Sequence, residues 1–377
     1  MIEFKGITKQ IGNKVILNDI NLHIKDGDLV VLIGPSGCGK TTTLKMINKL
    51  IKPTEGSIFI NGNLIAREDT IQLRRQIGYV IQNVGLFPHM TIKENIELIP
   101  KLKKEPLEKI NKKTIELLNM VGLNSDEYMN KYPAELSGGQ QQRVGVARAF
   151  ATDANIILMD EPFSALDPIT RSSLQDELLT LHQELKKTII FVTHDMDEAI
   201  KIADKICIMN GGKIQQYDTP ENILRRPANE FIKEFIGSKK IWDTPEFIKT
   251  KDIMIQDPIK VKPFRTIVQS IEMMKSNKVD SLLVVNKENQ LIGLVTLKQV
   301  RRDIPLDTKV EDVMEKELLY VKDDDNLVDV LTVMNENAVG YLPVVNKNKI
   351  LVGLVTKSSL ISVLSQQYLE EEVETNE

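Results

Sequence analysis

The chain has 377 residues, with 49 Lys and Arg against 53 Asp and Glu, so its formal net charge is −4. Apolar residues make up 42% and charged residues 27%, ordinary values for a globular protein, which excludes a disordered or collagen-like chain. The mildly acidic balance gives no general attraction to nucleic acid, and the length suggests two or three domains.

The chain contains no apolar run that approaches the ~18 residues of a membrane-spanning helix. Its apolar runs, such as 155–160 and 188–193, have only the length of strands. Residues 1–5 lack the pattern of a secretory signal, and the two cysteines, Cys38 and Cys207, form no CxxC pair. We therefore expect a chain in a reducing cytoplasm that does not cross a bilayer by itself.

Residues 1–240 alternate short apolar runs with helical stretches, the pattern of an α/β domain. Within them, Gly34-Pro35-Ser36-Gly37-Cys38-Gly39-Lys40-Thr41 matches the phosphate-binding motif GxxxxGK[ST] in full. The segment follows a strand expected at 28–33 and precedes a helix expected at 42–50, which is the context that the motif requires. That context argues against a glycine-rich turn that matches by chance.

This segment predicts a nucleotide site. Its glycines let backbone N–H groups surround phosphates, and the following helix adds its positive N-terminal end. Lys40 can reach the β- and γ-phosphates, and the Thr41 hydroxyl can bind Mg²⁺. The residues expected to hold the nucleotide are Gly34, Pro35, Ser36, Gly37, Cys38, Gly39, Lys40, Thr41 and Thr42.

A second anion-binding helix start is predicted at Leu136-Ser137-Gly138-Gly139-Gln140, where a serine and two glycines open a helix. One protein seldom needs two such sites for one triphosphate. We therefore expect Ser137, Gly138, Gly139 and Gln140 to contact a nucleotide held by another subunit.

Two further segments predict chemistry at strand ends. Residues 156–161 combine four apolar residues with Asp160 and Glu161, so Asp160 can hold Mg²⁺ and Glu161 can act as the general base. Taken alone, this segment could also be a buried strand with a capping acid, but its place beside a phosphate loop favours the catalytic role. His194 follows an apolar strand expected at 188–192, and a lone histidine in such a place is more often structural.

Together these motifs resemble the ATPase subunits of ABC (ATP-binding cassette) transporters, whose fold is a P-loop NTPase domain with a helical subdomain. The resemblance implies that Gln82 is the Q-loop glutamine, which touches Mg²⁺ and senses the membrane partner. It implies that 164–167 is the D-loop at a dimer interface, and that His194 is the switch histidine of the γ-phosphate. The implied cofactors are ATP and Mg²⁺, with catalytic residues Glu161, His194 and Gln82 and metal ligands Thr41, Gln82 and Asp160.

In that family two cassettes join head to tail, and each ATP lies between the phosphate loop of one and the signature of the other. The resemblance therefore implies a homodimer. One departure is Ile11, which stands where these ATPases usually have an aromatic residue stacked on adenine. We expect ATP to bind through its phosphates, with looser selectivity for the base.

The C-terminal part contains an internal repeat at a constant offset of 353 − 293 = 60 residues. Gly293-Leu294-Val295-Thr296 recurs as Gly353-Leu354-Val355-Thr356, and a Val-rich run precedes each copy. A linker is expected at 237–251, where the α/β pattern of the first part gives way to the internal repeat. Each repeat should form helix, strand, turn, strand and helix, with helices at 267–277 and 328–337 and strands at 282–285 and 342–345.

The repeat resembles a pair of CBS domains, an α+β regulatory module that binds adenine nucleotides or related ligands. The expected boundaries are an ABC domain at 1–240, CBS domains at 250–305 and 308–368, and an acidic tail at 369–377. CBS domains often have an acidic residue three positions after the threonine of the repeated strand. In this chain that position holds Gln299 in one repeat and Ser359 in the other, which argues against ordinary AMP binding. A dimerisation module without a ligand is the alternative.

An ABC ATPase followed by two CBS domains resembles the ATPase of bacterial osmoprotectant importers for glycine betaine, carnitine or choline, and residues 80–89 are very similar to that group. The resemblance implies integral membrane permease subunits, an extracellular substrate-binding protein reached through the permease, and a place on the cytoplasmic face of the cell membrane. Nucleic acid is not an expected partner.

In several members of that group the CBS pair binds cyclic di-AMP between subunits and stops transport. The residues suggested for such a ligand are Tyr341 for a base, Thr356 beside it, and Lys357 for a phosphate. Tyr341 could instead be a half-buried strand residue, and Lys357 a solvated one.

Three other functions are alternatives to the importer. A translation or repair ATPase usually has two cassettes or a long coiled coil in one chain, and the sequence shows neither feature. An exporter half is often fused to its membrane spans, and the sequence shows no such span. A CBS-regulated ATPase without a transport partner stays open on the sequence alone.

Overall fold

The computed structural model describes residues 1–377 except 83–84, 238–243, 301–303, 306 and 362–377. It divides into two compact units, residues 1–236 and 237–377, which are described separately. The end of the second predicted CBS domain and the predicted acidic tail lie outside the described residues. No helix among those described is long and apolar enough to cross a membrane.

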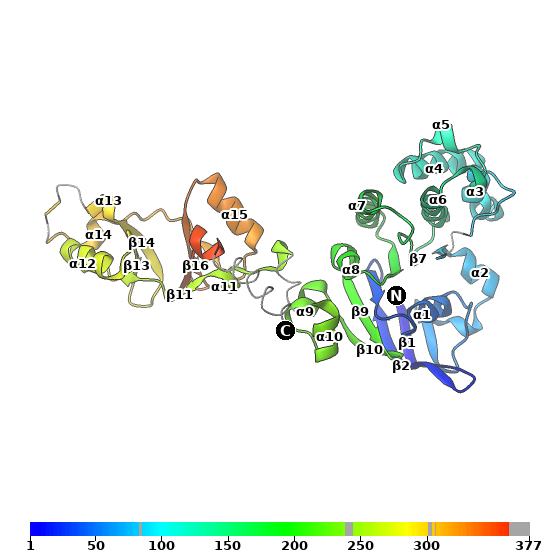
Figure 1. Cartoon of the computed structure of the whole chain (residues 1–377), viewed down its shortest axis with the longest axis horizontal. Helices are drawn as coiled ribbons and strands as arrows, with labels where there is room; N and C mark the ends of the chain where they lie inside the picture. Colours follow the sequence, from blue (N-terminus) through cyan, green and yellow to red (C-terminus); the bar gives the residue numbers. More distant parts are fainter. Residues whose placement is uncertain (83–84, 238–243, 301–303, 306, 362–377) are drawn as a thin grey trace, which may run out of the picture. The chain divides into compact units, whose positions relative to one another are not determined.

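The first unit contains a six-stranded sheet and a four-stranded antiparallel sheet (Figure 1). In the six-stranded sheet only the pair of β10 and β9 is antiparallel. The order of this sheet is β10 (Lys213–Asp218), β9 (Lys205–Asn210), β3 (Leu29–Ile33), β8 (Thr188–Val192), β7 (Ile156–Asp160) and β6 (Ile77–Val80). The other sheet follows the order β2 (Lys14–Ile24), β1 (Ile2–Ile11), β4 (Glu55–Ile60) and β5 (Asn63–Leu64).

Strand β3 lies inside the six-stranded sheet and is fully buried on both faces. Leu29, Val31 and Ile33 pack into one hydrophobic cluster, whereas Val30 and Leu32 pack into the other. Alternate side chains of a strand point to opposite faces, so a strand covered on both sides must be apolar throughout. This explains why β3 is apolar throughout, and why β7 and β8 are apolar apart from Asp160 and Thr188.

The helices of this unit form two sets. Helices α3 (Ile92–Leu102), α4 (Leu107–Met120) and α6 (Gly138–Ala151) pack on one another and, with α5 (Ser125–Tyr128), form the helical group seen in Figure 1. The others are α1 (Lys40–Ile47), α2 (Thr70–Arg75), α7 (Pro168–Leu185), α8 (Met196–Ile202), α9 (Pro220–Arg225) and α10 (Glu230–Ile236), with short 3₁₀ turns at Ile65–Arg67 and Pro133–Glu135. The expected α/β fold with a helical subdomain is thus present.

The second unit contains two small sheets, one for each repeat. The first sheet pairs β12 (Lys260–Val261), β13 (Ser281–Val285) and β14 (Leu291–Thr296), and the second pairs β11 (Ile255–Gln256), β17 (Leu351–Thr356), β16 (Tyr341–Val345) and β15 (Val321–Lys322). The helices are α11 (Thr250–Ile253), α12 (Ile267–Asn277), α13 (Leu297–Val300), α14 (Val310–Val313) and α15 (Leu327–Glu336), with a 3₁₀ turn at Pro245–Phe247.

The two repeats exchange the segments that precede them. Ile248 and Ile253 lie in the hydrophobic core of the second repeat, and β11 pairs with β17. In the same way Val310 lies in the core of the first repeat, where Glu315 bridges to Leu294. Each folded unit therefore consists of one sequence repeat together with the segment that precedes the other repeat.

This exchange corrects the predicted linker at 237–251. Residues 238–243 lie outside the described part, but Ile248 is 1% exposed and the Thr250 amide donates to the carbonyl of Asp325 at 2.8 Å. The later part of the predicted linker therefore belongs to the folded second unit. The change in the residue pattern was a poor guide to the end of the linker, because burial of a few apolar residues is enough to make a segment part of a core.

The glycine of each repeated strand accommodates the methionine of the exchanged segment. A Cβ added at Gly353 would lie 2.4 Å from Met254 Sδ, and one added at Gly293 would lie 2.5 Å from Met314 Sδ. Both distances are well inside van der Waals contact, so only glycine fits without a shift of the methionine.

We predict that Gly353→Ala lowers the free energy of unfolding of the second unit by about 1–3 kcal/mol, the usual effect of overpacking a core. Urea unfolding of the full chain, followed by circular dichroism, measures the change. Gly340→Ala is the matched control, since no atom lies within 4 Å of its added Cβ. Equal stability of the two variants would contradict the packing argument.

Candidate functional site

The phosphate loop lies between β3 and α1, at the carboxyl end of the sheet. Helix α1 begins at Lys40, two residues before the predicted start, and its N-cap is Gly39 with φ of 108°. A Cβ at Gly39 would lie 2.3 Å from Leu17 Cδ2, and one at Gly34 would lie 2.0 Å from the carbonyl oxygen of Met209. Backbone conformation and close approach both require glycine at these two positions.

Lys40 is the buried cation of the loop. Its side chain is 7% exposed, and Nζ donates to the carbonyl oxygens of Gly34 at 2.6 Å and Pro35 at 3.1 Å. These bonds hold a positive charge inside the curve of the loop, where it would attract phosphate oxygens.

Two of the predicted metal ligands meet directly. Thr41 Oγ1 donates a hydrogen bond of 2.8 Å to Asp160 Oδ1, although the residues are 119 positions apart. Asp160 is 2% exposed, and its burial raises the pKa of the carboxyl group. A hydroxyl and a carboxylate side by side beside a phosphate loop are the oxygen ligands that suit Mg²⁺.

The three predicted catalytic residues also come together. Gln82 Nε2 donates to Glu161 Oε2 at 3.2 Å, and His194 Nδ1 lies 3.6 Å from Glu161 Oε1. Glu161 directly follows β7 and has a positive φ of 49°, an uncommon conformation for glutamate. In this structure Gln82 therefore contacts the carboxylate of Glu161, while Thr41 and Asp160 share the hydrogen bond described above.

The second predicted anion site starts helix α6. Ser137 is its N-cap: Ser137 Oγ accepts from the Gln140 amide at 3.3 Å, and Gln140 Oε1 accepts from the Ser137 amide at 2.9 Å. This capping box fixes the start of the helix, and no atom lies within 4 Å of a Cβ added at Gly138. The helix start is therefore rigid and open at its glycine.

Sequence reasoning missed two buried polar residues that hold this region. Gln142, 1% exposed on α6, donates to the carbonyl of Glu161 at 3.1 Å and accepts from the Ala165 amide at 3.2 Å. Asn95, 0% exposed on α3, bonds Phe87 through both its amide and carbonyl groups. In the sequence, the only sign of either residue is that a polar side chain stands on the apolar face of a predicted helix.

The predicted adenine position, Ile11, is the last residue of β1 and is 59% exposed. An exposed aliphatic side chain offers a smaller surface to a base than an aromatic ring.

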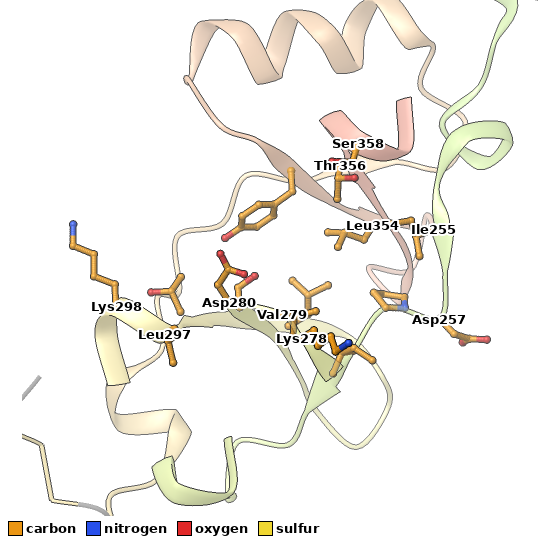
Figure 2. Close-up of a pocket in the computed structure, with 16 residues that line it drawn as sticks. Ile255, Asp257, Lys278, Val279, Asp280, Leu297, Lys298, Leu354, Thr356 and Ser358 are labelled. Carbon is orange, nitrogen blue, oxygen red and sulfur yellow. The ribbon is translucent and has the colours of Figure 1, made fainter. Parts of the chain in front are cut away.

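The second unit contains a cleft of about 1020 Å³, lined by residues of both repeats (Figure 2). Of the three residues suggested for a ligand, Tyr341 and Thr356 line this cleft, whereas Lys357 is exposed and is not among the lining residues. In Figure 2, Asp280 points toward the middle of the cleft, whereas Lys298 extends away from it. The charged residues of the lining are Asp257, Lys278, Asp280 and Lys298, so two positive charges balance two negative ones.

Gln299 and Ser359, which stand at the usual acid positions, each accept a hydrogen bond from the amide of the threonine three residues earlier. Gln299 Oε1 accepts from the Thr296 amide at 2.7 Å, and Ser359 Oγ accepts from the Thr356 amide at 3.0 Å. Their polar atoms are therefore already engaged within their own repeats.

Known protein families match both units. The ABC transporter family matches residues 17–164, and the CBS domain family matches residues 251–305 and 310–366. The carnitine transport ATP-binding protein OpuCA of Listeria monocytogenes is 50% identical over 366 residues, covering 97% of this chain and 92% of the relative. The glycine betaine/carnitine/choline transport ATP-binding protein OpuCA of Bacillus subtilis is 48% identical, covering 97% of this chain and 96% of the relative.

Solved structures are similar to the first unit. The dimeric ATP-binding cassette MJ0796 bound to ADP and Pi is 37% identical, with a TM-score of 0.54, covering 58% of this chain and 99% of that structure.

The chain is therefore an ABC ATPase, a protein that couples ATP hydrolysis to transport, as its sequence motifs predicted. It belongs to the family of ABC transporter ATP-binding subunits that carry two CBS domains after the cassette. The resemblance drawn from the motifs is confirmed on both counts.

We predict that Asp160→Asn leaves the nucleotide-free protein at least as stable as the wild type. Burial raises the pKa of Asp160, so its charge costs stability at neutral pH, and asparagine can still accept from Thr41. Loss of the charge should nevertheless weaken the stabilisation by MgATP, with at least a tenfold (about 1.4 kcal/mol) loss of affinity. Thermal unfolding with and without MgATP measures both effects, and an unchanged MgATP shift would contradict the assignment.

Proposed function

We propose that this chain is the ATP-hydrolysing subunit of an importer for quaternary amine compatible solutes, such as glycine betaine, carnitine or choline. The observation that carries the proposal is similarity of 46–50% identity over 97–99% of this chain to carnitine and choline transport proteins. Because the similarity includes the CBS unit as well as the cassette, it is more specific than a shared ATPase fold.

Each residue of the site has a role in the proposed reaction. Lys40 and the loop amides bind the phosphates, and Mg²⁺ held by Thr41 and Asp160 would neutralise charge on them. Glu161 takes a proton from the attacking water, and Gln82 orients its carboxylate through their hydrogen bond. His194, beside Glu161, contacts the γ-phosphate.

The start of helix α6 is proposed to serve a second copy of the chain. Ser137, Gly138, Gly139 and Gln140 would contact ATP bound to the phosphate loop of the partner, which makes the homodimer the active form. The exposed position of Gly138 and the 14-residue length of α6 support this role, because an open helix start attracts phosphate.

The other proposed partners are integral membrane permease subunits, with an extracellular substrate-binding protein reached through them. The chain would then lie at the cytoplasmic face of the cell membrane, as a peripheral subunit. The names of its relatives as transport proteins support these partners.

We predict that Glu161→Gln lowers the rate of ATP hydrolysis by about 10²–10⁴-fold, the usual contribution of a general base. ATP binding should persist, because glutamine can still bond Gln82 and does not alter the phosphate loop. Steady-state phosphate release and nucleotide titration of the full chain separate the two effects. Glu184→Gln, an exposed residue on α7, is the control, and normal turnover by Glu161→Gln would exclude Glu161 as the base.

The cleft between the CBS repeats is proposed to bind cyclic di-AMP and thereby regulate transport. Its volume of about 1020 Å³ is at the upper end of small-molecule sites, and Tyr341 offers a ring for stacking on a base. Lys278 of the lining can offset part of the charge of phosphates, while Lys298 extends away from the cleft and Lys357 is not among its lining residues. Thr356 would contact the ligand from the end of β17.

We predict that Tyr341→Ala weakens the binding of cyclic di-AMP to the full chain by about 5–100-fold, given ~1–3 kcal/mol for stacking on one base. Calorimetric titration, with AMP and ATP as comparison ligands, measures the change. Tyr320→Ala is the matched control, since Tyr320 is 43% exposed on the same unit and does not line this cleft. Failure of the wild type to bind would favour a structural role for the CBS unit.

A further inference from the structure

Two loops carry the catalytic pair, and one arginine contacts both. Residues 162–167 follow Glu161, and residues 193–195 include His194. Arg171, on the first turns of α7, donates from Nη2 to the carbonyl of Leu166 at 3.2 Å, and its Nη1 lies 3.6 Å from Asp195 Oδ2. A single planar guanidinium therefore links the two loops in a fixed geometry, which the point charge of a lysine would not reproduce.

Asp195 is itself held firmly by local bonds. Its Oδ1 accepts from the amides of Asp197 at 2.9 Å and Glu198 at 3.2 Å and so caps helix α8, and its own amide donates to Thr193 Oγ1 at 3.1 Å. One carboxylate oxygen thus serves the cap and the other faces Arg171. Because Asp195 directly follows His194, any bond that fixes Asp195 also restricts the backbone of the histidine.

His194 depends on such restriction because little packs around its ring. Its side chain is 67% exposed, while its partner Glu161 is 21% exposed, so the loop backbone must set their 3.6 Å separation. A small cavity of about 40 Å³ is lined by both residues and also by Ser164, Arg171 and Thr193. Arg171 therefore borders the space in which the catalytic carboxylate and histidine face each other.

We propose that Arg171 is a positioning residue for ATP hydrolysis. By linking Leu166 to Asp195 it holds the loop after Glu161 and the loop of His194 at a constant spacing. It touches Leu166 and Asp195 rather than Glu161 or His194, so it acts on turnover through these loops. The inference rests on the proposed roles of Glu161 and His194.

A neighbouring ion pair supplies a matched control. Lys201 on α8 lies 2.8 Å from Asp176 Oδ1 and donates to Ser172 Oγ at 3.0 Å, and both partners are on α7. It therefore joins the same two helices as Arg171 and Asp195 without a contact to either loop. Loss of general packing between α7 and α8 would affect both pairs alike, whereas loss of loop position would affect only the first.

The test compares Arg171→Met, Asp195→Asn, their double variant and Lys201→Met as full chains in steady-state ATP hydrolysis. Asparagine keeps the N-cap of α8, so Asp195→Asn removes the charge with little effect on the helix. We expect each of the first two variants to lower kcat about tenfold, because a small misplacement of reacting groups is costly, with KM for ATP changed less than about twofold. The double variant should be no slower than the slower single variant, as expected for one shared interaction.

Arg171→Lys should recover only part of kcat, and Lys201→Met should retain the rate of the wild type. A normal kcat in both Arg171→Met and Asp195→Asn would overturn the proposal, as would fully additive losses or an equal loss in Lys201→Met. Thermal unfolding identifies a variant that fails to fold, in which case Asp195→Asn decides the question. A wild type without ATPase activity would contradict the proposed function itself, which distinguishes that failure from failure of the positioning role.

Discussion

The site depends on the register of three buried parallel strands. Leu32 of β3 pairs with Val192 of β8, and Val192 pairs in turn with Asp160 of β7. The next residues along each strand therefore leave the sheet at the same edge, which brings together the phosphate loop, Glu161 and the loop of His194. A slip of one residue in any pair would turn Asp160 to the other face of the sheet and separate it from Thr41.

Burial of the strands on both faces stabilises that register. The strands β3, β7 and β8 are buried along their whole length, and the two clusters that cover them contain most of the apolar residues of the first unit. Polar groups inside such a core are stable only when they are bonded. Gln142 and the pair of Thr41 with Asp160 meet this condition with bonds that also place the site, so here stability and function use the same interactions.

The second unit follows a different rule, in which two copies of one sequence complete each other. Each repeat supplies a short segment to the core of the other, and a methionine from that segment lies against the repeated glycine. Neither repeat therefore has a complete core without its companion. The cleft that both repeats line is a consequence of this pairing, and a ligand bound in it would contact both copies at once.

The sequence by itself determined the parts whose chemistry lies in contiguous residues. The phosphate loop, the strand that ends in Asp160, the capped start of α6 and the 60-residue repeat (353 − 293) all depend on local composition and periodicity. Only the tertiary structure decided which distant residues touch: Arg171 on two loops, Gln142 behind Glu161, Ile248 in the second repeat, and Lys357 outside the cleft. The reason is physical, since such contacts depend on strand register and on the rotation of each helix against its neighbours, neither of which a single sequence states.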